Sequence, residues 1–140
     1  MKKLSIVCFA LFFIGLGLSR SARSSPQDAA IQERKRAAVA LLRVINTGEA
    51  AHERRQNRFC SPSELADAGL IGAMGKPFGP AWKAEAFRQA VLPEPLAGYT
   101  MHFTLDAGGR SYSVALSSES DGAAFFTDER GLIYEAKPIG

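Results

Sequence analysis

The sequence has only two histidines and two cysteines among its 140 residues. Neither an HxxxH nor a CxxC spacing occurs, so the sequence does not support a zinc site. Serine is plentiful, but no GxSxG motif places a serine at a nucleophile elbow. The glycines at positions 72, 75 and 79 are not followed by the Lys-Ser or Lys-Thr pair of a phosphate-binding loop. We therefore expect no enzyme activity and no bound cofactor.

Long apolar runs are also scarce. The longest uncharged one, Leu4–Leu18, has about fifteen residues, whereas a membrane-spanning helix needs about twenty. Lys2 and Lys3 precede this run, and small polar residues follow it, which is the layout of a secretory signal peptide. We expect residues 1–24 to be a cleaved signal peptide, with a retained membrane anchor as the alternative. The rest would then be periplasmic or secreted.

Outside this leader the chain has no net positive charge. The chain has 17 cationic and 14 acidic side chains, a net charge of +3. The leader holds four of the cations and no acid, so thirteen cations and fourteen acids remain after cleavage. A nucleic-acid-binding protein needs a basic surface that survives processing. We therefore expect no nucleic-acid partner, and membrane contact only through an uncleaved leader.

Cleavage would also remove Cys8 and leave Cys60 as the single cysteine. One thiol cannot form an internal disulfide. We expect Cys60 to be a small buried residue beside Phe59, with an intermolecular disulfide or a reactive thiol as the alternatives. A thiol–imidazole pair with His52 would need a third group that the sequence does not indicate.

Helix breakers are nearly absent between Ser25 and Arg58, where Gly48 is the exception. Ser25 is a suitable N-cap, and Pro26 suits the first helical position. Residues at helical spacing predict one core or interaction face, made of Ile31, Ala38, Leu41, Leu42, Ile45 and Gly48. Polar residues occupy the other side, namely Lys35, Arg36, Arg43, Asn46, Glu53, Arg54 and Asn57.

The segment after this helix begins with a second cap. Ser61-Pro62-Ser63-Glu64 predicts a capping box and a short helix to about Ala68. A loop rich in glycine and proline follows at 71–80. Trp82–Val91 has apolar residues at helical spacing and predicts one more helix, which Pro93 and Pro95 would stop.

The last third alternates with the period of a β-strand. Apolar and polar residues alternate through Tyr99–Leu105 and again through Tyr112–Ser117, and Asp106–Gly109 supplies a turn between them. A third and a fourth strand are expected on either side of a turn at Asp128–Gly131. The sequence thus predicts an α+β fold, with a long N-terminal helix packed on a three- to four-stranded antiparallel sheet and short helices in the connection.

In this order of elements the chain resembles the globular heads of type IV pilins and type II secretion pseudopilins, over most of residues 29–136. Ala40–Glu49 is similar to the latter half of a pilin helix, and Arg58–Leu65 to the turn and short helix that follow. Gly98–Leu105 resembles the first sheet strand, and Phe125–Ile133 a closing hairpin.

The front of the chain departs from the family. Gly15 and Gly17 are each followed by leucine, and no glutamate lies in the apolar run, so the prepilin processing motif is missing. The resemblance therefore implies an exported, non-polymerising structural or interaction module. Its partners would be pilus, secretion-system or other envelope proteins, and its oligomeric state is left open.

Two further expectations accompany this resemblance. Some pseudopilins bind calcium near the last loop, which makes Asp121, Asp128 and Glu129 calcium candidates; ordinary turn chemistry is the competing interpretation. A small periplasmic binding or inhibitor protein with a helix-on-sheet fold is the alternative function. In that case the loop Ile71–Trp82 would be a binding edge.

Overall fold

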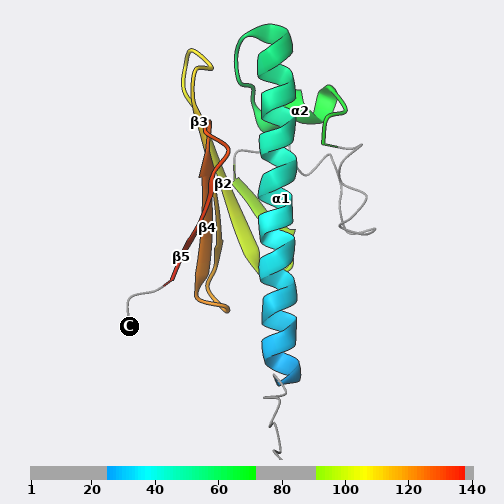
Figure 1. The fold of residues 1–140 in the computed structure, drawn as a ribbon, viewed down its shortest axis with the longest axis vertical. Helices are drawn as coiled ribbons and strands as arrows, with labels where there is room; N and C mark the ends of the chain where they lie inside the picture. Colours follow the sequence, from blue (N-terminus) through cyan, green and yellow to red (C-terminus); the bar gives the residue numbers. More distant parts are fainter. Residues whose placement is uncertain (1–24, 72–90, 138–140) are drawn as a thin grey trace, which may run out of the picture.

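The structure is a computed structural model that describes residues 25–71 and 91–137. Its elements are α1 (Pro26–Gln56), α2 (Pro62–Asp67), β1 (Val91–Leu96), β2 (Tyr99–Leu105), β3 (Tyr112–Ser118), β4 (Ala123–Asp128) and β5 (Ile133–Ala136). Figure 1 shows α1 as a long rod along one face of the sheet. The predicted leader, most of the 71–80 loop and most of the helix expected at Trp82–Val91 lie outside the described residues.

Both predicted helix starts are confirmed. Ser25 Oγ accepts a hydrogen bond from the Asp28 amide at 3.1 Å, and the Asp28 carboxylate accepts one from the Ser25 amide at the same distance. Ser61 and Glu64 form the same reciprocal capping box at the start of α2. Each box satisfies amides that the first turn leaves without partners inside the helix. α1 ends at Asn57, which adopts the left-handed conformation with φ 55°.

The sheet has five strands, where the sequence predicted three or four. All neighbours are antiparallel and follow the order β1-β2-β3-β4-β5. The additional strand is β1, which contains Pro93 and Pro95. We expected these prolines to stop a helix, and instead they lie in a strand at the sheet's edge. Proline is tolerated there because one side of an edge strand has no neighbour that needs an N–H donor.

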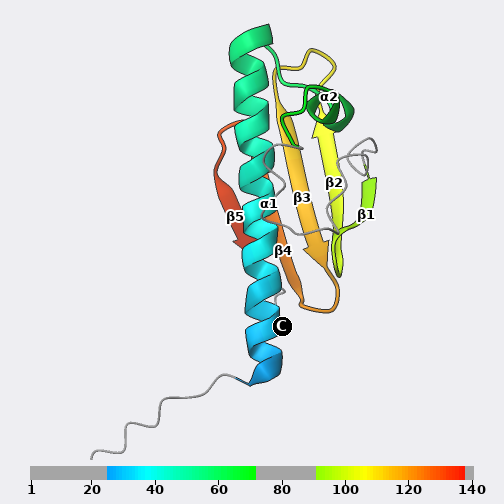
Figure 2. The ribbon, with the colours of Figure 1, turned by 90° about the vertical axis from the view of Figure 1, so that its right-hand side faces the viewer.

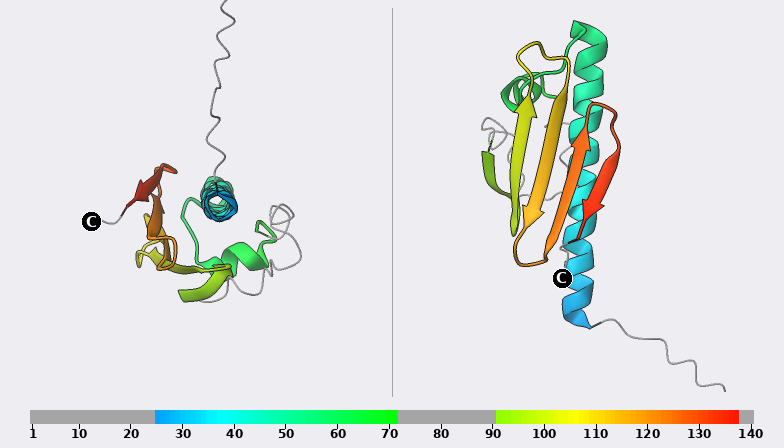
Figure 3. Two further views of the ribbon diagram at one scale, coloured as in Figure 1. Left: turned by 90° about the horizontal axis from the view of Figure 1, so that it is seen from below. Right: turned by 90° about the vertical axis from the view of Figure 1, so that its left-hand side faces the viewer.

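The core lies between α1 and the concave face of the sheet. Figure 3 shows the strands arranged in an arc around one side of the helix. Alternate residues of β2, β3 and β4 face α1 and are buried, and the period-2 pattern predicted this for β2 and β3. The buried residues are Tyr99, Met101, Phe103, Tyr112, Val114, Leu116, Ala123, Phe125 and Thr127. The convex face of the sheet is left for other contacts.

The N-terminal part of α1 extends beyond the sheet. α1 has 31 residues, which at 1.5 Å per residue gives a rod of about 46 Å. None of the residues in Pro26–Ala37 is buried, and Ala38 is the first that is. Figure 2 shows these first turns continuing past the end of the strands. The exposed start of the helix is therefore available to other molecules.

We expect Gly109→Ala to lower the free energy of unfolding by about 1–3 kcal/mol, because a side chain is strained in this backbone conformation and also meets a neighbour. Gly109 has φ +64°, and an added Cβ would lie 2.9 Å from the Phe59 carbonyl oxygen. The Gly109 carbonyl also accepts a hydrogen bond of 2.8 Å from the Phe59 amide. Urea unfolding measures the loss.

Gly69→Ala is the matched control for this prediction. Gly69 has a similar φ of +69°, but no atom of the described residues lies within 4 Å of an added Cβ. It therefore reports the backbone strain without the steric contact. Equal losses in the two variants would show that the approach of the β2–β3 turn to Phe59 is unimportant.

Candidate functional site

The predicted apolar face of α1 is largely core. Ala38, Leu41, Leu42 and Ile45 are completely buried, and Gly48 is buried with them. Ile31, in the part of α1 where no residue is buried, is only half-buried. Since this face packs against the chain's own sheet, a partner must meet other surfaces of the helix.

Asn46 joins α1 to the β4–β5 hairpin, although the sequence placed it on the polar side of the helix. Its Nδ2 donates to Thr127 Oγ1 at 2.8 Å and to the Gly131 carbonyl at 3.1 Å. Its Oδ1 accepts from the Tyr112 hydroxyl at 2.9 Å. Thr127 Oγ1 in turn donates to the Leu132 carbonyl at 2.9 Å. These bonds fix the position of β5 relative to the helix.

Two ion pairs extend this attachment toward the start of α1. The Arg34 guanidinium donates two hydrogen bonds to the Asp121 carboxylate, at 2.9 and 2.5 Å. They hold the pKa of Asp121 below its ordinary value. Lys35 Nζ lies 2.9 Å from Glu135 Oε1, which links the helix directly to β5. The turn of α1 that contains Arg34 and Lys35 is therefore held against the β3–β4 turn and the last strand.

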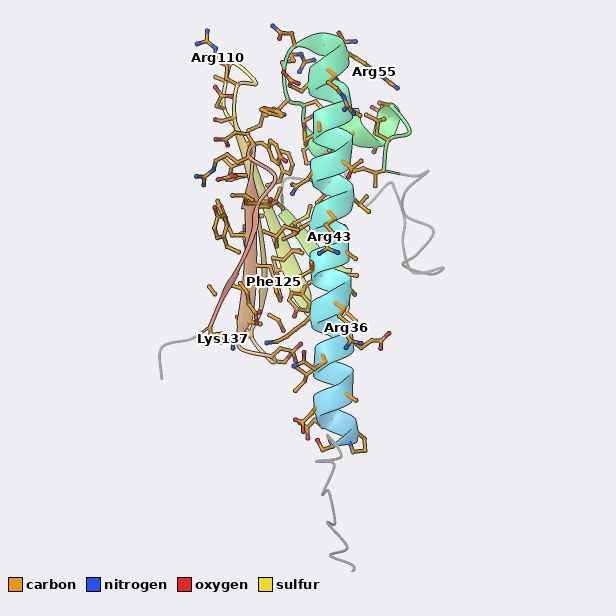
Figure 4. The ribbon with its side chains drawn as sticks, in the orientation of Figure 1. Arg36, Arg43, Arg55, Arg110, Phe125 and Lys137 are labelled. Carbon is orange, nitrogen blue, oxygen red and sulfur yellow. The ribbon has the colours of Figure 1, made fainter. Side chains whose placement is uncertain are left out.

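A cationic groove lies between α1 and the end of the sheet at β5. Its volume is about 400 Å³, within the range of ligand-binding clefts. Four cations and one acid line it, namely Lys35, Arg36, Arg43, Lys137 and Glu135. Its apolar lining comes from Val39, which is half-buried, and Phe125, which is buried. Figure 4 shows Arg36 and Arg43 along α1, with Phe125 between helix and sheet and Lys137 at the end of β5.

The convex face of β4 and β5 carries two exposed aromatic side chains. Phe126 on β4 and Tyr134 on β5 are 40% and 44% exposed, and their rings lie 6.3 Å apart. Leu132, just before β5, is 55% exposed. An exposed apolar cluster beside charged residues is typical of a protein-binding surface. The cationic groove and this aromatic cluster thus lie on opposite faces of one sheet edge.

Glu49 is the most unusual titratable group of the described chain. Its side chain is completely buried, and Oε2 accepts a hydrogen bond from the Cys60 amide at 3.0 Å. Glu49 Oε1 has no hydrogen-bond partner among the residues that the structure describes. Burial raises the pKa of Glu49 to about 7, although the hydrogen bond from Cys60 opposes this shift. The carboxyl group therefore exchanges its proton near neutral pH.

Cys60 is a buried free thiol, as the sequence favoured. Burial and the neighbouring Glu49 raise the pKa of its thiol to about 12. The thiolate is the reactive form of cysteine, so both its burial and its raised pKa disfavour reaction of Cys60 in the folded chain. His52 does not supply a base for it, because His52 Nδ1 donates to the Arg58 carbonyl at 3.0 Å. An intermolecular disulfide would require local unfolding.

The structure does not bring the calcium candidates together. Asp121 precedes β4 and Asp128 ends it, so the two lie about 20 Å apart along the extended chain. Asp121 pairs with Arg34, Asp128 pairs with Arg130, and Glu129 is an exposed turn residue. Among residues 25–71 and 91–137, no group of three acidic, histidine or cysteine side chains could hold a metal ion.

Sequence reasoning missed both Glu49 and the groove. Glu49 follows Ile45 by four positions and Leu42 by seven, so helical spacing alone places it on the apolar face. The side of α1 that carries Lys35, Arg36 and Arg43 was correctly predicted to be polar. The groove itself depends on where β5 lies against the helix, and no local pattern contains that information.

No known protein family, curated protein or solved structure matches the chain. None of the helices in the described part of the chain has the length and apolarity needed to cross a membrane.

Proposed function

We propose that the chain is an exported, pilin-like interaction module that does not polymerise and that binds a pilus, secretion-system or other envelope protein. One observation supports this proposal above the others. A long helix lies along an antiparallel meander that contains every strand of residues 25–71 and 91–137. This is the arrangement that the resemblance to pilin heads implied.

The exposed surfaces agree with a binding role. The first turns of α1 extend past the sheet, cations of α1 and Lys137 line the groove beside β5, and aromatic residues lie on the convex face of the same edge. Interfaces are enriched in aromatic and arginine side chains. A partner could therefore be bound without disturbing the core between α1 and the sheet.

Site-specific cross-linking in cells that make the protein tests this function. A photoreactive residue at Arg36 or Tyr134 should give an adduct with an envelope protein, and one at Arg110, at the far end of the molecule, should not (Figure 4). Intact-mass analysis of the same material should show the loss of residues 1–24. A protein recovered with its leader inside the cell, or adducts only with further copies of the chain, would contradict the proposal.

A small periplasmic binding or inhibitor protein is the second function that we propose, and the cationic groove beside Val39 and Phe125 favours it. The same cross-linking distinguishes the two functions. A pilus or secretion component in the adduct supports the interaction module, whereas a soluble enzyme supports the inhibitor. The loop Ile71–Trp82, which we expected to serve the inhibitor, lies almost entirely outside the described residues.

A further inference from the structure

The two edges of the sheet are protected to different degrees. β1, at one edge, contains two prolines, which lack the N–H that a further strand would need. β5, at the other edge, is Ile133–Ala136 and contains no proline, so each of its residues has an N–H. Its one charged side chain, Glu135, is paired with Lys35. Every second residue of β5 points its N–H and C=O away from β4. In the described chain, no strand pairs with that side of β5.

The open edge of β5 lies beside the cationic groove. The sheet curves around α1, so that β5 is close to the helix and Glu135 reaches Lys35 (Figure 3). A strand added to β5 would lie about 4.8 Å further along the sheet, over the groove. Its side chains on the concave face would lie beside Glu135, whose charge Lys35 neutralises, and would meet Arg36 and Arg43, which are seven positions apart and share one side of α1.

The side chains on the other face of an added strand would meet different chemistry. Tyr134 lies on the convex face of β5 at 44% exposure, with Phe126 next to it. Cross-strand apolar pairs on one face stabilise a sheet. The two faces together therefore select a strand in which acidic residues alternate with apolar ones.

We propose that β5 binds an extended segment of a partner protein as a sixth strand of the sheet, and that this segment alternates acidic with apolar residues. The acidic side chains pair with Arg36, Arg43 and Lys137 in the groove, and the apolar ones pack beside Tyr134. Main-chain hydrogen bonds to the edge give affinity, and the alternation gives specificity. This proposal rests on the binding function above and names the kind of partner segment.

Fluorescence anisotropy with the purified full chain tests the charge preference. The probe is a labelled seven-residue peptide of alternating glutamate and valine, and the reference peptide has lysine in place of glutamate. We expect saturable binding of the acidic peptide, weakened by added salt, and none of the basic one. Equal binding of both peptides, or of neither, would overturn the proposal.

Charge-reversal variants locate the site. Arg36→Glu combined with Arg43→Glu should weaken binding of the acidic peptide by about tenfold or more, since two ion pairs become repulsions. Arg55→Glu combined with Arg110→Glu makes the same change of charge away from the groove (Figure 4). This control should retain the wild-type affinity. An equal loss in the two double variants would show that the peptide responds only to overall charge.

Backbone methylation distinguishes strand addition from simple charge attraction. In an extended strand, the residues that point their N–H toward the neighbouring strand all have side chains on one face. Two peptides are therefore compared, one methylated at the glutamate amides and the other at the valine amides. One should lose binding and the other retain it. Equal affinities would rule out pairing with β5.

The peptide experiments and the cross-linking experiment can fail independently of each other. If the acidic peptide does not bind but an envelope adduct forms, the interaction module is retained and the β5 edge is the wrong surface. If the peptide binds with the expected methylation pattern but no envelope adduct forms, the edge site is correct and the proposed cellular role is wrong.

Discussion

Replacing Glu49 with glutamine should stabilise the chain at pH 8 by about 2–3 kcal/mol and leave it nearly unchanged at pH 4. The folded pKa of Glu49 is about 7, against an ordinary value of 4.5. Below pH 4.5 the carboxyl is protonated in both the folded and unfolded states and contributes no difference. As pH rises from 4.5 to 7, the unfolded state loses its proton first, so stability falls. Above pH 7 the charged carboxylate remains buried, and the full cost persists.

Urea unfolding of the wild type and Glu49→Gln between pH 4 and pH 8 measures this effect. The groups that act on Glu49 do not titrate in this window: the pKa of Cys60 is about 12, that of Glu64 about 2, and burial raises that of Tyr112 above its ordinary value. Other titrating groups are common to both proteins and cancel in the difference. A stability difference that does not change with pH would show that Glu49 is not buried as a carboxyl group.

The second large effect is expected at Leu42. Leu42→Ala should destabilise the chain by about 2–5 kcal/mol, because the residue is completely buried between α1 and the sheet and its loss leaves a cavity. Ile31→Ala is the matched control, since Ile31 belongs to the same predicted face but is only half-buried. Its loss should be less than about 1.5 kcal/mol, because less apolar surface returns to water.

Thermal and urea unfolding at pH 5 measure both variants, at a pH where Glu49 is largely protonated in the folded state. Equal losses at Leu42 and Ile31 would mean that the sheet covers the helix evenly along its length. That result would contradict the exposed first turns of α1, and with them the surface on which the proposed function partly depends.

The parts of the fold that were predictable are those set by neighbouring residues. Ser25 and Ser61 both cap their helices as predicted, and the capping box expected at Ser61 and Glu64 formed; the second box, between Ser25 and Asp28, was not predicted. The alternation in Tyr99–Leu105 correctly identified the buried face of β2. The spacing of Leu41, Leu42 and Ile45 correctly identified the buried stripe of α1. In each case the local pattern and the tertiary contacts favour the same conformation.

The errors arose where distant parts of the chain decide the structure. We interpreted Pro93 and Pro95 as the stop of a helix, because proline is tolerated neither inside a helix nor in a central strand of a sheet. Only the presence of β2 as a neighbour made an edge strand possible there. Asn46 looked like a solvated residue, yet its amide reaches a hairpin more than eighty positions later. The groove beside β5 was missed for the same reason, because it forms between α1 and a strand far away in the sequence.

The order of the strands also determines when the chain can fold. Each strand pairs with the one that follows it, so every turn of the sheet closes over a few residues and costs little loop entropy. α1, in contrast, is synthesised first and finds its principal partner, β4, about seventy residues later. Until the ribosome has released that strand, the leucine stripe of the helix has no cover. The core between α1 and the sheet therefore cannot be completed before β4 has been synthesised.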